Sequence, residues 1–175
     1  EGYESNGITQ QTKSVDVRHI LVMPEGATTD NIRTDTFDDA AWEASRQKAE
    51  ELLAQWEQGD KSEDSFAELA NENSADTGSN TNGGLYTGVT EGQMVEAFND
   101  WCFDADRKAG DYGIVKTQFG YHIMYFCGSQ LLWESQAKSD LISQMSSDFL
   151  NDAVASADAK IDYSAIKLGY LNLGA

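Results

Sequence analysis

Two histidines are the residues whose type and position most directly suggest chemistry. His19 lies in the apolar run 17–22 (VRHILV) and His122 lies in the run 121–126 (YHIMYF), and the chain has no other histidine. Both runs are rich in β-branched and aromatic residues, which favour buried strands. A lone histidine on such a strand is more often a hydrogen-bonded core residue than a catalyst. Two on facing strands can bond each other, directly or through a hydroxyl such as that of Thr117.

Three further residues are candidates for the same site. Asp76 lies in a stretch rich in turn formers, 74–84, where an aspartate alone is expected to form a turn. Met94 and Phe98 are four residues apart in an expected helix, so both side chains would project from one helical face. That spacing fits either ordinary core packing or an apolar binding slot.

The two cysteines, Cys102 and Cys127, show neither a metal-ligand spacing nor a CxxC pair. They are interpreted as two buried thiols or as a disulfide, and the sequence leaves both open. A metal site made of the two histidines and Asp76 would lack any familiar ligand spacing, so no metal is expected.

The elements that must position these residues follow from hydrophobic periodicity and turn formers. The expected strands are 14–23, 85–87, 112–117 and 121–127, and the expected helices run from Asp38 or Asp39 to Gly59, over 62–73 and over 92–103. Helices clustered early and a small, largely antiparallel sheet indicate an α+β domain at about 15–128. Residues 1–14 are interpreted as a linker or tail.

A long helix is expected after Leu131. Its apolar residues step by four, an advance of about 40° per step, so the stripe spirals around the helix axis. The stripe consists of Trp133, Ala137, Leu141, Met145, Phe149 and Ala153. Either the helix wraps the preceding domain, or its far half docks on another segment or another copy of the chain. The tail 161–173 is expected to be a strand or a docked extended segment.

The charge balance excludes some partners. The chain of 175 residues carries 12 Lys and Arg against 30 Asp and Glu, a net charge of −18, which repels nucleic-acid phosphates and anionic lipid. No apolar run approaches the length of a membrane span, and no signal peptide is present. Because the sequence opens without Met, it is interpreted as a processed or truncated piece of a longer protein.

Six motifs in register resemble one family, the parvulin-type peptidyl-prolyl cis/trans isomerases. They are RHILV (18–22), KAEELL (48–53), FAELA (66–70), S-x-D-x-GS…GG-L (74–85), GQMVEAF (92–98) and TQFGYHIM (117–124). The resemblance covers about 15–128 without a missing element. The following helix is similar to the C-terminal segment of bacterial extracytoplasmic foldases related to PrsA and SurA, where it packs with an N-terminal chaperone half.

The resemblance implies a parvulin-like (FKBP-like) fold, with a four-stranded sheet, about three surrounding helices and a C-terminal helical extension. It implies isomerisation of Xaa-Pro bonds without any cofactor. The family's histidine pair falls on His19 and His122, and Asp76 falls on an active-site position that holds Cys or Asp. The residues expected to bind substrate are Leu85, Met94, Phe98, Thr117 and Phe119.

One departure from the family narrows the range of expected substrates. The phosphoserine-directed branch has a basic cluster after the first strand, whereas here Arg33 stands alone among the acidic residues of 24–38, so no phosphopeptide specificity is expected. Gly84 also replaces an acidic residue common at that place in the family, and one extra residue lies between Leu85 and Met94, so the rim of the proline pocket is expected to differ. The expected clients are unfolded or extended chains outside the cytoplasm, with self-association through the C-terminal helix. The alternative is a holdase that binds chains with little turnover.

Overall fold

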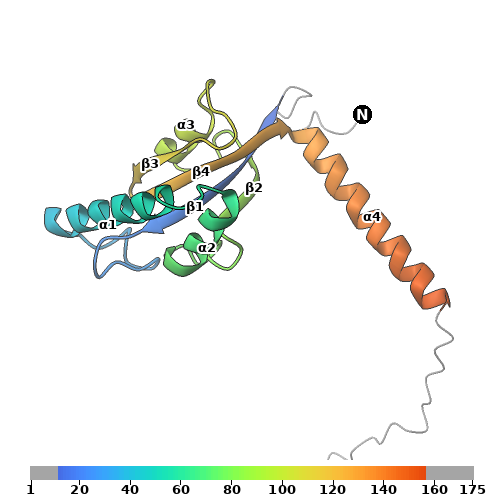
Figure 1. The fold of residues 1–175 in the computed structure, drawn as a ribbon, viewed down its shortest axis with the longest axis horizontal. Helices are drawn as coiled ribbons and strands as arrows, with labels where there is room; N and C mark the ends of the chain where they lie inside the picture. The colour runs from blue at the N-terminus through green and yellow to red at the C-terminus, as the bar shows by residue number, and fades with distance from the viewer. Residues whose placement is uncertain (1–11, 157–175) are drawn as a thin grey trace, which may run out of the picture. The chain divides into compact units, whose positions relative to one another are not determined.

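The computed structural model describes residues 12–156, which form an α+β fold as expected (Figure 1). Four strands make one antiparallel sheet in the order β2-β1-β4-β3. The strands are β1 (Lys13–Val22), β2 (Leu85–Thr90), β3 (Tyr112–Thr117) and β4 (Gly120–Leu131), and the helices are α1 (Asp39–Glu57), α2 (Glu63–Asn73), α3 (Glu96–Cys102) and α4 (Leu132–Ser156). The segment expected at 161–173 and most of the 1–14 tail lie outside the described residues.

Strand β4 is longer than the sequence predicted, whereas β1 has the predicted length and is shifted by one residue. β4 continues to Leu131, where it pairs with Lys13 at the start of β1, and a bulge interrupts the register between Asp16 and Val17. The sheet therefore extends beyond the domain boundary expected at residue 128. Residues 128–131 lack an apolar run, and it is their pairing with 13–16 that makes them a strand.

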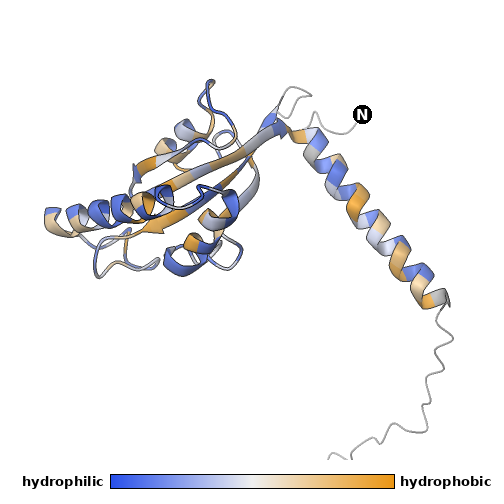
Figure 2. Ribbon diagram, viewed as in Figure 1, coloured by the Kyte–Doolittle hydropathy of each residue, from blue (hydrophilic) through white to orange (hydrophobic). Residues whose placement is uncertain are grey.

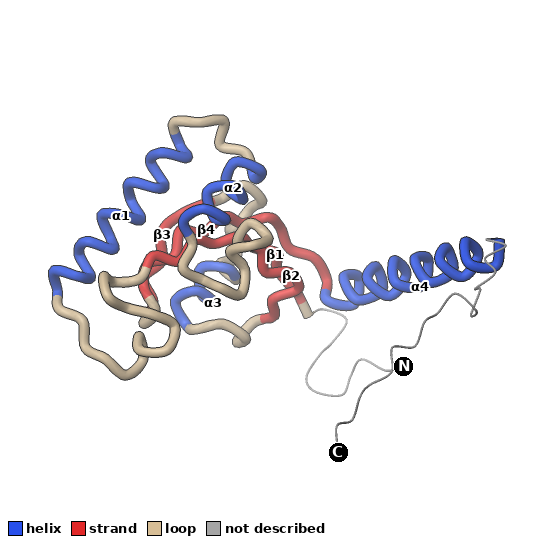
Figure 3. Tube along the Cα trace, turned by 90° about the horizontal axis from the view of Figure 1, so that it is seen from below, coloured by secondary structure: helices blue, strands red, loops and turns tan. Residues whose placement is uncertain are grey.

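Helices α1 and α2 cover one face of the sheet, where the larger core lies (Figure 3). Their starts were visible in the sequence because each has a capping side chain: the Asp38 carboxylate accepts from the backbone N–H of Ala41 at 2.8 Å, and the Ser62 hydroxyl accepts from that of Ser65 at 3.0 Å. The buried residues of this core are Ile20, Val22, Ala49, Leu52, Trp56, Phe66, Leu69, Ala70 and Ile123. In Figure 2, hydrophilic and hydrophobic residues alternate along α1 and α2, and β1 is hydrophobic toward its end.

Helix α3 covers the opposite face and is shorter than expected. It begins at Glu96, with Val95 as an extended N-cap residue, so Met94 precedes the helix and does not share a helical face with Phe98. The reason is a turn before the helix. The backbone N–H of Gln93 donates to the Thr90 carbonyl at 3.1 Å, and the Gln93 side-chain carbonyl accepts from the Thr90 N–H at 3.1 Å. Met94 still packs against the core that contains Phe98.

The chain divides into two units inside α4, one ending at Gln136 and the next beginning at Ala137. Helix α4 was expected from the stripe of apolar residues, and several of these are exposed, including Met145 at 62% and Phe149 at 72%. Among the described residues, no helix is both long enough and apolar enough to cross a membrane.

Candidate active site

The two histidines meet on the α3 face of the sheet. His19 lies on β1 and His122 on the neighbouring β4, and their Nδ1 atoms are 3.1 Å apart although the residues are 103 positions apart in sequence. Both residues are buried, His19 with 2% and His122 with 5% of its surface exposed. The expectation of a facing, hydrogen-bonded pair is confirmed by this geometry.

Asp76 contacts the His19 nitrogen that does not face His122. Its Oδ2 atom lies 3.1 Å from His19 Nε2, and it accepts hydrogen bonds from the Ser79 hydroxyl at 2.5 Å and the Tyr86 hydroxyl at 2.7 Å. The other oxygen, Oδ1, accepts a longer bond from the backbone N–H of Gly78 at 3.3 Å. Asp76 is therefore an anchored carboxylate and more than a turn former.

Thr117 contacts the His122 nitrogen that does not face His19. Its hydroxyl oxygen lies 2.9 Å from His122 Nε2 and accepts from the backbone N–H of Phe119 at 3.1 Å. An ionised carboxylate can only accept, so with both rings neutral one set of tautomers makes every contact a hydrogen bond. His19 Nε2–H donates to Asp76, His122 Nδ1–H donates to His19 Nδ1, and the Thr117 hydroxyl donates to His122 Nε2.

Burial and hydrogen bonding set the ionisation states in this hydrogen-bonded network. Burial, together with the nearby His19, lowers the pKa of His122 to about 3, so this imidazole is neutral near neutral pH. The hydrogen bonds from His19, Ser79 and Tyr86 hold the pKa of Asp76 well below its usual range, against the opposing effect of burial. The site is thus one partly buried carboxylate joined to a neutral His122 through His19.

Aromatic rings enclose the histidine pair. Phe98, only 2% exposed, meets both imidazoles edge-on, with ring centroids 5.4 Å from His19 and 5.5 Å from His122. Tyr86 packs against His19, with centroids 4.8 Å apart and ring planes at 31°. The two rings restrict where the His19 imidazole can tilt.

Two glycines allow the backbone to close around the pair. A Cβ on Gly84 would lie 2.2 Å from the carbonyl oxygen of His19, and one on Gly120 would lie 2.3 Å from that of Val22. Both residues also have positive φ, +69° and +145°, where side chains are strained. Any larger residue would displace β1 from its partners beside the site.

The structure brings most, but not all, of the predicted site residues together. Leu85 pairs with Arg18, whose guanidinium contacts Glu63 of α2, so Leu85 lies on the far face of the sheet and its assignment to the site is wrong. Tyr86 faces the histidines instead. Phe119 is half-buried in the β3–β4 turn, with the Arg33 guanidinium 4.8 Å from its ring centroid.

Sequence reasoning missed Ser79 and Tyr86. Both lie within the motif 74–85 or directly after it, but a hydroxyl in a turn-rich loop and a tyrosine in a short strand carry no distinctive signal. The alternation of faces along β2 would have selected Tyr86 over Leu85, had the register with β1 been known.

The cysteines lie outside this network and are free. Cys102 packs in the α3 core, and the Cys127 sulfur lies 3.5 Å from the Glu63 carboxylate. Burial raises the pKa of each thiol to about 12, so neither is a thiolate nucleophile near neutral pH. In residues 12–156, no three His, Cys, Asp or Glu side chains are grouped to hold a metal.

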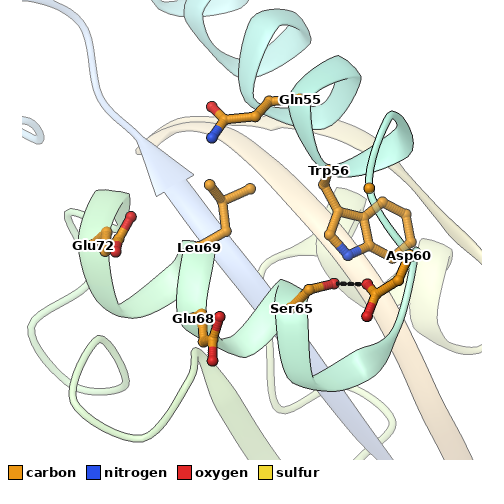
Figure 4. A pocket seen from close by; sticks show the side chains of 8 residues that line it. Gln55, Trp56, Asp60, Ser65, Glu68, Leu69 and Glu72 are labelled. Atoms are coloured by element: carbon orange, nitrogen blue, oxygen red, sulfur yellow. Dashed lines mark hydrogen bonds between the residues drawn. The ribbon is translucent and has the colours of Figure 1, made fainter.

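A hollow between α1 and α2 lies on the opposite face of the sheet (Figure 4). Trp56 and Leu69 form its apolar part, and Asp60, which accepts from the Ser65 hydroxyl at 2.6 Å, lies at its edge. No hydrogen bond, ion pair or ring contact joins these residues to His19 or His122. We therefore assign the chemistry to the network on the α3 face.

Comparisons with known proteins identify the family to which this fold belongs. The family described as the PPIC-type PPIase domain matches residues 3–128. Foldase protein PrsA 1 of Listeria innocua is 34% identical over 111 residues, which cover 63% of this chain and 29% of that protein. Foldase protein PrsA 1 of Bacillus cereus is 34% identical over 136 residues, covering 71% of this chain and 45% of that protein.

A solved structure shows the same relationship. The crystal structure of PrsA from Bacillus subtilis has 27% identity and a TM-score of 0.51, and the match covers 87% of this chain and 53% of that one. This chain thus spans only part of the length of the relatives it matches. The match across residues 3–128, on a fold that assembles Asp76, His19, His122 and Thr117 in one hydrogen-bonded network, shows that the chain belongs to the PPIC-type, or parvulin, peptidyl-prolyl isomerase family.

Proposed function

We propose that this chain isomerises Xaa-Pro bonds of unfolded or extended polypeptides and so assists their folding. The observation that carries the proposal is the continuous network Asp76–His19–His122–Thr117 with Phe98 against both imidazoles. Family membership supports the same reaction.

The reaction suits a site without a cofactor. Rotation about the amide bond faces a barrier of about 18–20 kcal/mol because resonance gives the bond partial double-bond character. No covalent bond is made or broken, so the site needs to hold the proline ring and favour the twisted amide over the planar forms. Met94, Phe98 and Phe119 are the apolar side chains we assign to proline binding.

The carboxylate is the group we assign to the amide carbonyl. Planar amides place negative charge on the carbonyl oxygen, and twisting the bond reduces that charge. An ionised Asp76 beside the oxygen would destabilise the planar form and so lower the barrier. The histidine pair, neutral at His122, holds this carboxylate in place and transfers no proton.

The substrate is proposed to be unmodified. Arg33, stacked on Phe119, is the only basic residue of the loop 24–38, against Glu25, Asp30, Asp35 and Asp38. A single arginine among four carboxylates is a poor site for a phosphate. Peptides with Ser-Pro and phosphoserine-Pro compared side by side test this point, since a preference for the phosphorylated form would contradict it.

The wider setting is also a proposal. The similarity to PrsA foldases supports a domain of a longer foldase that acts outside the cytoplasm on secreted chains, with residues 15–128 as the isomerase domain and 129–175 as part of a chaperone region. Fractionation of cells that express the full-length protein tests the compartment. Recovery from the cytosol alone would refute it.

Helix α4 is proposed to mediate self-association. It exposes apolar side chains along much of its length, namely Leu141, Ile142, Met145, Phe149, Leu150 and Val154. Burying a large apolar side chain is worth about 1.5–3 kcal/mol, so a second copy that covers them would be stabilised. Sedimentation should show a dimer, and Phe149→Ser should disrupt it. The control Lys138→Ser, which changes a polar residue on the same helix, should leave the dimer intact. A monomer at every concentration would refute it.

One experiment separates the isomerase from a holdase with the same fold. A proline-limited refolding reaction should accelerate with substoichiometric amounts of the chain, because a catalyst turns over, and Phe98→Leu should reduce the acceleration while Cys127→Ser retains it. A holdase would suppress aggregation in proportion to its amount and leave the refolding rate unchanged. That second result would replace the proposed function.

A further inference from the structure

We propose that Tyr86 is a positioning residue for the reaction, because it restrains both partners of the Asp76–His19 pair at once. Its hydroxyl donates to Asp76 Oδ2 at 2.7 Å, and its ring packs on the His19 imidazole at 4.8 Å. The mechanistic part of this inference rests on the proposed isomerase function. The structural part, the restraint on the pair, does not.

The position of Tyr86 on β2 makes the restraint rigid. Tyr86 pairs with Val17 on β1, two residues before His19 on the same face of the strand. The phenol therefore approaches the pair from the sheet, whereas Asp76 and Ser79 belong to the loop between α2 and β2. A strand-borne donor fixes where the loop places its carboxylate.

The Tyr86 hydroxyl also gives the two carboxylate oxygens of Asp76 different hydrogen-bond environments. Oδ2 is saturated by His19, Ser79 and Tyr86, whereas Oδ1 has only the 3.3 Å bond from the Gly78 backbone. Because Asp76 is partly exposed, with 18% of its side chain accessible, Oδ1 remains the oxygen free to act on a substrate carbonyl. Without Tyr86, the carboxylate could rotate and exchange these roles.

Tyr86 stays a donor under all ordinary conditions. Burial and the neighbouring Asp76 carboxylate both raise the pKa of its hydroxyl above the usual range. The phenol is therefore neutral wherever the protein is folded near neutral pH, and Ser79 alone would leave Oδ2 with one hydroxyl donor.

The conservative variant Tyr86→Phe tests the inference. It keeps the ring on His19 and removes only the hydroxyl, so folding is expected to be retained. The matched control is Tyr112→Phe, which removes a tyrosine hydroxyl near another carboxylate, Glu57, on the α1 side. Both variants are compared with the wild-type chain.

Two readouts distinguish positioning from simple stability. Nitrogen NMR of the His19 ring reports its tautomer and hydrogen bonds, and we expect Tyr86→Phe to shift these resonances while Tyr112→Phe does not. In the isomerase assay, we expect Tyr86→Phe to lower kcat about tenfold with KM unchanged, the effect of losing about one charged hydrogen bond. No other conservative substitution at position 86 is expected to restore the activity, because no other side chain of this size places a hydroxyl at that point.

The NMR result stands apart from the proposed function. Ring resonances of His19 that are the same in Tyr86→Phe and in the wild type would overturn the inference, whatever the activity. Resonances that shift while kcat is unchanged would overturn the mechanistic role. A wild-type chain without isomerase activity would refute the proposed function alone and leave the shift as support for the restraint.

Discussion

The neutral, buried state of His122 makes the stability of this protein depend on pH in a way that can be calculated. In the unfolded chain the imidazole titrates near its ordinary pKa of about 6.5. In the folded protein its pKa is lowered to about 3, because the ring is buried and lies beside His19. Between these values the unfolded state binds a proton that the folded state does not, so the free energy of unfolding falls as pH falls through this window.

The magnitude follows from the two pKa values. At about pH 7 the unfolded imidazole is mostly neutral, so protonation hardly stabilises the unfolded state. At about pH 5 it is almost fully protonated, and the free energy of unfolding is lower than at pH 7 by about 2 kcal/mol. The result is nearly the same for any folded pKa below about 4, because the folded ring is then neutral at both pH values. This makes the prediction insensitive to the depth of the shift.

Urea unfolding followed by tryptophan fluorescence at the two pH values measures this difference, since Trp56 is buried in the core. His122→Gln has no imidazole at this position, so its stability should fall by about 2 kcal/mol less than that of the wild type on acidification. Ile123→Val, a neighbouring core variant that keeps His122, should show the wild-type dependence. Equal pH dependence in His122→Gln and the wild type would refute the buried neutral ring.

Three further predictions concern the site and its backbone. Phe98→Leu should lower kcat/KM for an Xaa-Pro peptide about tenfold or more, because it removes the ring edge against both imidazoles. The control Cys127→Ser should change kcat/KM by less than about twofold. Equal losses in the two variants at equal stability would make Phe98 a core residue only. EDTA should leave the isomerisation rate unchanged, and its loss on chelation would contradict a mechanism that uses side chains alone. Gly120→Ala should lower the free energy of unfolding by at least about 2 kcal/mol more than Gly110→Ala, because only the first places a Cβ 2.3 Å from a backbone oxygen. Similar losses in the two variants would show that β1 shifts to accommodate the Cβ.

The early helices and the histidine strands could be read from the sequence because their signals are local. Asp38 and Ser62 cap helices whose apolar faces recur at helical spacing, and the two histidine runs are β-prone over their whole length. The start of α3 was misjudged because Gly92, with φ +82°, and Gln93 close a turn that the apolar spacing of Met94 and Phe98 conceals.

The site was harder to predict where it depends on strand register. Leu85 and Tyr86 are adjacent, so a shift of one residue exchanges their faces, and only the pairing with Val17 and Arg18 decides which one meets His19. The network partner Ser79 is likewise invisible in a loop of similar polar residues. The approach of Asp76 to His19 requires contacts across 57 positions, which no local pattern specifies.

The network on the α3 face is proposed to catalyse rotation about the prolyl bond. NMR exchange spectroscopy on a short, unmodified Xaa-Pro peptide tests it most directly, because it measures cis/trans interconversion without a coupling enzyme. A catalytic amount of the chain should produce exchange peaks between the two isomers, and Asp76→Ala should greatly weaken them while Asp60→Ala, which changes a carboxylate on the opposite side, preserves them. No exchange with the wild-type chain, or equal exchange in both variants, would contradict the account.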